Sequence, residues 1–188
     1  MNTLTPAGEK LLTAASGLFY RHGIRAVGVD LIAETAGTTK KTLYDRFGSK
    51  DALVALYLER RAEYWRSFLL EHMRGRTVVG VFDVLALWLR DQDRGCAFVN
   101  AYAEIGGTDH PAERVIREEK AWMREYFVGL VREAGFPAEL GPELHLLYEG
   151  ATVLATAGGA PEAPAQARVA AERALTAYGS APTTGSAG

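Results

Sequence analysis

Apolar residues recur at intervals of three and four along almost the whole chain, the spacing that places them on one face of an α-helix. The first helix is predicted to begin at Pro6, which needs no backbone N–H in the first turn, with Thr5 as its N-cap. Gly23 is suited to end this helix in a left-handed conformation. Its apolar face consists of Leu11, Leu12, Ala15, Leu18 and Phe19.

Two short helices and a long one follow. The first short helix begins at Val29 and ends at Gly37, and the second is predicted over Lys40–Phe47 with Thr39 as its N-cap. Gly48 then interrupts the helical pattern before the long helix begins. The apolar positions of the long helix are Leu53, Leu56, Tyr57, Tyr64 and Phe68.

The rest of the chain shows the same periodicity in longer segments. An apolar stripe runs through residues 78–89, a shorter helix is predicted over Ala97–Ile105, and the strongest pattern covers residues 115–131. Two alanine-rich helices follow, around residues 144–154 and 169–178. No segment is typical of a strand, so the sequence predicts an all-α protein of about nine helices.

Composition narrows the class of protein. The chain has 188 residues, of which 48% are hydrophobic, enough for a substantial core, and this excludes a wholly disordered or fibrous protein. No apolar run approaches the ~20 residues of a membrane span, and the first ten residues lack the features of a secretory signal. Cys96 is the only cysteine, which excludes an internal disulfide and a multi-thiolate metal site. We therefore expect a cytoplasmic protein.

Charge is unevenly distributed along the chain. Residues 1–61 carry nine Lys and Arg against six Asp and Glu, a net charge of +3. Residues 62–188 carry twelve against seventeen, a net charge of −5. A small basic head on an acidic body suggests two roles, one of which involves an anionic partner.

Residues 29–50, VDLIAETAGTTKKTLYDRFGSK, are the most informative stretch. They contain two helices too short to be stable alone, joined by a tight turn at Gly37. This is typical of a helix-turn-helix, whose second helix lies in the major groove of DNA. Lys40 and Lys41 stand in the first turn of that helix, where a cation is unfavourable to the helix dipole unless an anion is bound. The candidate DNA-binding residues are Thr39, Lys40, Lys41, Thr42, Tyr44, Arg46 and Lys50. A solvated basic surface turn is the alternative interpretation.

The segment GIRAVGVDLIAETAGTTKKTLYDRFGSKDAL, residues 23–53, resembles the DNA-binding domain of TetR/AcrR-type transcriptional regulators. The resemblance implies a homodimer on a (pseudo)palindromic operator, usually a repressor that a small effector in the C-terminal domain releases from DNA. It also implies backbone contacts by Thr39, Tyr44 and Lys50, and base contacts mainly by Lys40, Lys41 and Thr42.

This sequence departs from the family pattern at three positions. Gly28 stands where the family often has a phosphate-binding threonine, so that contact is in doubt. Lys41 replaces a common glycine and is expected to alter base preference. Arg46 stands where histidine is frequent and is expected to serve equally well for phosphate.

The C-terminal part carries polar and aromatic residues on apolar helix faces. Clefts between the helices of a bundle are common ligand sites, although aromatic stripes at helical spacing are also typical of a core. Cys96 is interpreted either as a thiol sensor near Arg94 or as a buried, inert cysteine at a helix start. The candidate pocket residues are Trp65, Trp88, Asn100, Glu104, Trp122, Tyr126, His145 and Tyr148.

Small residues on the last two predicted helices permit close backbone approach, and we expect these helices to form a four-helix dimer interface. Packing within one chain is the alternative. The predicted organisation is a helix-turn-helix domain at residues 1–48, a ligand-binding and dimerisation domain at 49–178, and a disordered tail at 179–188. The small residues are Gly150, Ala151, Ala155, Ala167, Ala170, Ala171 and Ala174.

The sequence contains no phosphate-cradling glycine loop, metalloprotease motif, nucleophile elbow or Cys/His metal spacing. We therefore expect a transcriptional regulator without enzymatic activity, cofactor or metal, and without a membrane partner. The alternatives are a helical small-molecule-binding protein or enzyme without specific DNA binding, and a protein-interaction adaptor. The effector, the operator and the direction of regulation stay open.

Overall fold

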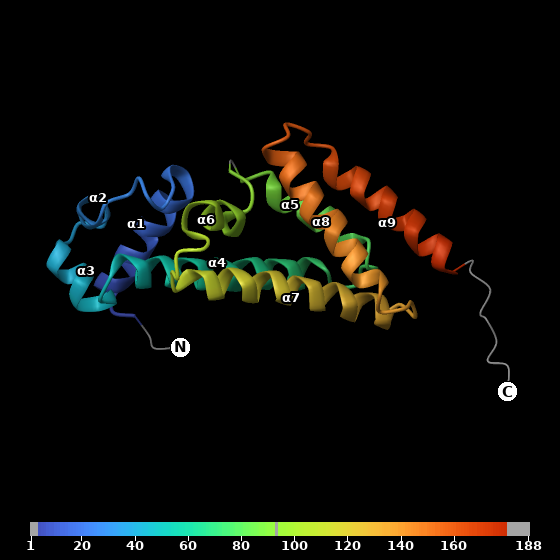
Figure 1. The fold of residues 1–188 in the computed structure, drawn as a ribbon, viewed down its shortest axis with the longest axis horizontal. Helices are drawn as coiled ribbons and strands as arrows, with labels where there is room; N and C mark the ends of the chain where they lie inside the picture. The colour runs from blue at the N-terminus through green and yellow to red at the C-terminus, as the bar shows by residue number, and fades with distance from the viewer. Residues whose placement is uncertain (1–3, 93, 180–188) are drawn as a thin grey trace. The chain divides into compact units, whose positions relative to one another are not determined.

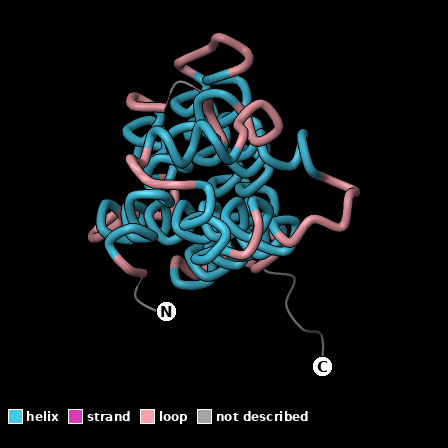
Figure 2. The backbone as a smooth tube through the Cα atoms, turned by 90° about the vertical axis from the view of Figure 1, so that its left-hand side faces the viewer, coloured by secondary structure: helices cyan, strands magenta, loops and turns pink. Residues whose placement is uncertain are grey.

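The computed structural model of the protein describes residues 4–92 and 94–179. Within these ranges it contains nine α-helices and no strand (Figures 1 and 2). The predicted all-α fold is confirmed. The helices are α1 (Pro6–His22), α2 (Val29–Thr35), α3 (Lys40–Phe47), α4 (Lys50–His72), α5 (Gly80–Leu89), α6 (Ala97–Ile105), α7 (Ala112–Glu133), α8 (Leu140–Thr156) and α9 (Ala163–Gly179).

Local capping explains the ends of the first helix. The Thr5 hydroxyl accepts a hydrogen bond from the backbone N–H of Gly8, as its predicted N-cap role requires. At the other end Gly23 has a φ of 89°, and its N–H donates to the carbonyl of Phe19. A side chain at that φ would be strained, so glycine is suited to this helix end.

The last helix differs most from its prediction. α9 begins at Ala163, before the apolar pattern recognised in the sequence, because alanine favours a helix and Pro164 is tolerated in the first turn. It ends at Gly179, which was predicted to belong to the disordered tail. The remaining tail residues, 180–188, lie outside the described residues.

The chain forms two compact units. The first contains the chain up to Phe68 together with Cys96–Lys120, and the second contains Leu69–Gly95 and the chain from Ala121 onward. The first unit is thus larger than the predicted helix-turn-helix domain of residues 1–48. The reason is that α1, α2 and α3 share one hydrophobic core with α6 and with parts of α4 and α7. Its large buried residues include Leu11, Leu12, Ile32, Leu43, Leu53 and Leu58.

The second unit has a core of its own, in which α5, α8 and α9 pack against one another. Phe82 of α5 and Phe127 of α7 are almost fully buried, with ring centroids 6.2 Å apart. The Arg168 guanidinium of α9 donates to both carboxylate oxygens of Asp83 on α5, at 3.1 and 3.2 Å. Apolar packing and this ion pair together hold α9 in the unit.

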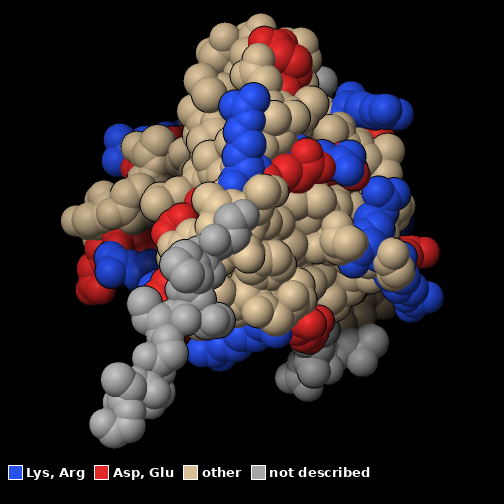
Figure 3. Space-filling view, turned by 90° about the vertical axis from the view of Figure 1, so that its right-hand side faces the viewer, with Lys and Arg blue, Asp and Glu red and all other residues tan. Residues whose placement is uncertain are grey.

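The surface is mixed in charge. Figure 3 shows a face on which residues other than Lys, Arg, Asp and Glu predominate, with positive and negative side chains interspersed and in places adjacent. Among the described residues, no helix has the length and apolar character that crossing a membrane demands. In the same part of the chain, no cluster of three or more His, Cys, Asp or Glu has metal-binding geometry.

Candidate functional site

A tight turn joins α2 to α3. The N–H of Gly37 donates to the carbonyl of Glu34, and the N–H of Thr38 donates to that of Ala33, at 3.0 and 2.9 Å. Gly37 has a φ of 63°, a conformation that glycine adopts without strain. Two short helices closed by such a turn form a helix-turn-helix.

The second of these helices, α3, is capped at its start and anchored by one buried side chain. The Thr39 hydroxyl accepts from the N–H of Thr42 at 3.2 Å, so the predicted N-cap is confirmed. The two threonine hydroxyls also lie 2.9 Å apart and share a hydrogen bond. Leu43 has no exposed surface and fixes α3 to the core of the first unit. The helix therefore has one buried side and a long exposed one.

The exposed side of α3 carries the predicted cations. The Lys40 ammonium lies 3.2 Å from the Asp30 carboxylate, and that of Lys41 lies 2.7 Å from the Asp45 carboxylate. The Lys41 side chain is 84% exposed. Exposed ion pairs of this kind contribute at most about 1 kcal/mol, so a phosphate or a base edge competes readily for either lysine.

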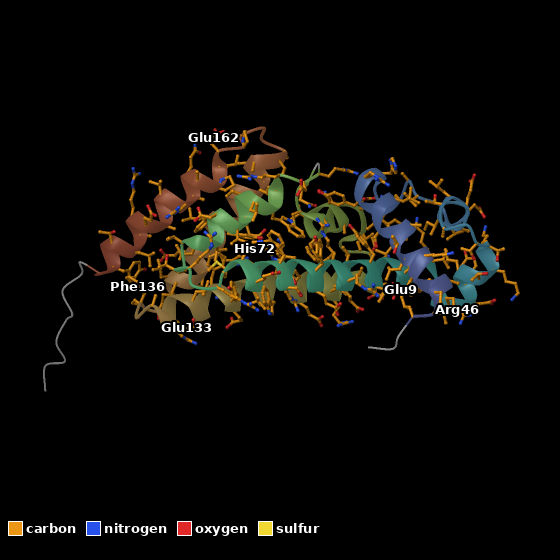
Figure 4. All side chains as sticks on the ribbon, turned by 180° about the vertical axis from the view of Figure 1, so that it is seen from behind. Glu9, Arg46, His72, Glu133, Phe136 and Glu162 are labelled. Carbon is orange, nitrogen blue, oxygen red and sulfur yellow. The ribbon has the colours of Figure 1, made fainter. Side chains whose placement is uncertain are left out.

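Tyr44 and Arg46 complete this polar face. Tyr44 is exposed over 43% of its surface. Arg46 is exposed in the last turn of α3, where Figure 4 labels it. The structure thus brings six of the seven predicted DNA-binding residues together on one short helix and its N-cap.

Lys50, the seventh, has a different environment. Its ammonium donates to the carbonyl of Ile24 at 2.6 Å and lies 5.9 Å from the centroid of the Phe19 ring. Burial lowers the pKa of this ammonium, against the opposing effect of Asp51 and Glu104. The Lys50 ammonium is engaged within the protein, and its contact with phosphate stays a prediction.

The predicted ligand-pocket residues are divided between the two units. Trp65, Asn100 and Glu104 belong to the first unit, and the other five belong to the second. Trp65 is only 5% exposed and stacks on Phe68, which is typical of a core position. Asn100 lies half-buried on α6. The carboxylate of Glu104, also on α6, accepts hydrogen bonds from the backbone N–H groups of Ile24 and Arg25.

Four of the five residues in the second unit form aromatic contacts. Trp122 and Tyr126 are half-buried on α7 and stack with ring centroids 5.2 Å apart. His145 of α8 lies beside the ring of Phe127 and 3.1 Å from a carboxylate oxygen of Glu149. Tyr148 and Trp88 complete the set, Tyr148 buried on α8 and Trp88 half-buried on α5. Whether any of the eight contacts an effector stays a prediction.

Sequence reasoning did not identify an open groove in the first unit. Its volume is about 470 Å³, and α6 and α7 supply its lining. Beside it Cys96, half-buried, accepts a hydrogen bond from the Lys120 ammonium at 3.7 Å. The sequence signal for this groove is the presence of apolar residues, Val99 and Tyr102, on the exposed side of α6. The signal is weak, because single exposed apolar side chains are common on any helix. The lining residues are Phe98, Val99, Tyr102, Ile116, Arg117 and Lys120.

The predicted dimerisation helices have two different faces. Ala151, Ala167 and Ala171 are buried by packing within the chain, which is the alternative that the sequence left open for them. A second face of α8 is exposed and apolar, with Leu146 74% exposed and Leu154 53% exposed. This exposed face consists of Leu146, Val153 and Leu154, and Val169 is similarly exposed on α9.

Comparisons with known proteins agree with this geometry. Residues 11–57 match the family described as bacterial regulatory proteins, tetR family. Over 68 residues, or 36% of this chain, the sequence is 38% identical to the HTH-type transcriptional activator FasR of Mycolicibacterium smegmatis. That match spans 31% of the activator's length.

Two solved structures are similar over most of the chain. A TetR-family transcriptional regulator from Streptomyces coelicolor has a TM-score of 0.80 and 27% identity, covering 92% of this chain and 95% of its own. A putative TetR-type regulator from Streptomyces avermitilis has a TM-score of 0.75 and 28% identity, covering 90% and 99%. The head and the rest of the chain therefore resemble the same kind of protein. Residues 11–57 thus match the tetR family of bacterial regulatory proteins, and over most of its length the chain is similar to TetR-type transcriptional regulators.

Proposed function

We propose that this regulator binds a (pseudo)palindromic operator as a homodimer, with α3 of each subunit in the major groove. The observation that carries the proposal is the exposed polar face of α3, where two lysines, a tyrosine and an arginine project from a helix anchored by Leu43. Lys40 and Lys41 stand at the N-terminal end of α3, the end that reads base edges in helix-turn-helix proteins. Their present partners are exposed carboxylates that DNA displaces at little cost.

The roles of the candidate residues divide by position. Thr39, Tyr44 and Arg46 bind backbone phosphates, which supplies affinity without sequence preference. Lys40, Lys41 and Thr42 read base edges, where lysine pairs with the acceptors of guanine. Lys50 reaches phosphate only after it leaves the Ile24 carbonyl.

The exposed apolar face of α8 supports dimerisation. Leu146, Val153 and Leu154 recur at the helical spacing, so they form one stripe along α8. An apolar stripe of this kind is stabilised when a second copy covers it across a two-fold axis. A dimer also places two recognition helices on half-sites about one turn of DNA apart, as this class of motif requires.

An effector bound by the body releases the protein from its operator, and the protein therefore represses transcription in the cytoplasm until the effector is present. Release requires that the effector prefers a conformation whose recognition helices no longer fit adjacent major grooves. Activation is the second candidate, because the curated relative that matches the DNA-binding region is an activator. Neither mode requires a cofactor or a metal.

Selection from genomic DNA tests the proposal. Purified protein is mixed with sheared DNA of its source organism at fixed near-physiological salt, and the bound fragments are sequenced. We expect enrichment of a few sites that contain an inverted repeat, and in vitro transcription from those sites separates repression from activation. Uniform weak binding that persists after the protein has been stripped and refolded would instead favour a helical ligand-binding protein.

A further inference from the structure

The connection between α1 and α2 is anchored in the core of the first unit by the buried side chains of Ile24 and Val27. It runs from Gly23, which ends α1, to Gly28, which precedes α2. Gly28 provides no side-chain hydrogen bond to the start of α2. Because α2 packs against both α1 and α3, the conformation of this connection is one of the constraints on the orientation of the recognition helix.

Two side chains distant in the sequence hold this connection. The Glu104 carboxylate on α6 accepts from the N–H of Ile24 at 2.9 Å and from the N–H of Arg25 at 2.7 Å, one bond to each oxygen. The Lys50 ammonium at the start of α4 donates to the carbonyl of Ile24 at 2.6 Å. Both backbone polar groups of the buried Ile24 are thus bound by charged side chains, which form stronger hydrogen bonds than neutral groups do.

The Glu104 carboxylate also lies directly against the end of α1. A Cβ atom at Gly23 would lie 2.9 Å from one carboxylate oxygen of Glu104, closer than real contacts allow. Gly23 therefore provides space for the carboxylate as well as the left-handed turn. The Glu104 carboxylate of α6 thus packs closely against Gly23 at the end of α1.

We propose that Glu104 is a positioning residue for DNA binding: by holding the α1–α2 connection, it sets the orientation of α2 and α3 that fits the operator. The chain returns from the second unit at Gly95 and forms α6 almost immediately, at Ala97. A displacement of α6 would therefore be transmitted to the α1–α2 connection directly through Glu104, and not only through α4. This inference rests on the proposed operator binding.

The test compares wild type with Glu104→Gln and Glu104→Ala on an operator selected by the wild type. Glutamine retains the length of the side chain but presents an N–H₂ donor to one of the two backbone N–H groups. We expect about tenfold weaker binding to the native operator for Glu104→Gln, as for the loss of one charge-assisted hydrogen bond, and a larger loss for Glu104→Ala, which removes both bonds. Binding to a random duplex, which depends on phosphate neutralisation, is expected to stay unchanged.

A change of half-site spacing separates positioning from simple stability. Operators lengthened or shortened by one base pair bind the rigid wild type poorly, and we expect the variants to discriminate less between native and altered spacing. Hydrogen exchange at the Ile24 and Arg25 amides is expected to be faster in both variants. Glu118→Gln is the matched control, since it removes a negative charge from an exposed carboxylate of the same unit.

Two results would overturn the positioning role alone, and a third would overturn the proposed function as well. Unchanged spacing discrimination in a folded Glu104→Gln protein that selects the wild-type operator overturns the positioning role alone. Equal losses on operator and random DNA also overturn it, because they indicate general destabilisation. A wild type that selects no operator overturns the proposed function together with this inference.

Discussion

The two surfaces proposed to act, the exposed face of α3 and the exposed stripe of α8, are opposite in chemistry and in how they can be recognised. The residues of α3 are polar, contiguous in sequence and anchored by a single buried leucine. The stripe of α8 is apolar, and it continues a helix whose other face is buried in the core. A polar face of this kind carries a motif that can be recognised in the sequence. An exposed apolar face can be identified only from the structure, which shows which apolar residues of the helix remain exposed.

The largest expected effect comes from charging the apolar stripe. Leu146→Asp combined with Leu154→Asp places two carboxylates on the proposed dimer surface, and we expect a monomer in sedimentation equilibrium. Operator affinity is expected to fall by about a hundredfold or more, since the second half-site no longer binds as part of the same particle. Leu70→Asp, at an exposed leucine of α4, is the matched control. If the double variant stays dimeric, the exposed stripe of α8 does not form the dimer interface.

A second prediction compares a buried and an exposed leucine. Leu43→Ala on α3 removes a side chain with no exposed surface, and we expect a loss of about 2–5 kcal/mol in the free energy of unfolding. Leu146→Ala on α8 removes one that is 74% exposed, with an expected change within about 0.5 kcal/mol for the monomer. Urea denaturation at a protein concentration low enough to dissociate the proposed dimer measures both losses. Similar losses under these conditions would contradict the exposure of Leu146 in the single chain.

A third prediction separates the two kinds of contact on α3. Tyr44→Ala is expected to weaken binding to all sequences, and Arg46→Ala to reduce the slope of log affinity against log salt by about one. Lys41→Ala is expected to cost about 1–3 kcal/mol on the operator and to change base preference at one position. Titrations on operator and random duplex at several salt concentrations measure these effects. Uniform losses by all three variants would contradict the division of roles.

The smallest expected effect concerns Asp45, the ion-pair partner of Lys41 on α3. Asp45→Asn removes the carboxylate that lies 2.7 Å from the Lys41 ammonium. Because an exposed pair of this kind contributes at most about 1 kcal/mol, we expect random-DNA affinity to rise by only about two- to threefold. Glu125→Gln, at an exposed carboxylate in the second unit, removes the same charge away from α3 and is the control. A weaker affinity would mean that Asp45 orients Lys41 for DNA.

Local structure was largely predictable because its causes are local. The ends of α3 coincide with the predicted Lys40–Phe47, since the Thr39 cap and Gly48 act within a few residues of the chain. The contacts that Lys50 and Glu104 make within the protein were not predictable in the same way. Both side chains hydrogen-bond to the backbone of Ile24, 26 and 80 residues away from them, while their roles at phosphate and in a pocket stay predictions. No periodicity in the sequence indicates contacts over such separations.

The amino-acid sequence by itself determined the all-α class, the order of the helices and the helix-turn-helix, because helical periodicity, caps and turn glycines act over a few residues. Only the tertiary structure decided which small residues of α8 and α9 pack within the chain and which apolar residues stay exposed. It alone brought Glu104 and Lys50 to the α1–α2 connection. The physical reason is that burial and long-range hydrogen bonds depend on which helix faces meet, and amphipathic patterns indicate that a face is buried without indicating its partner.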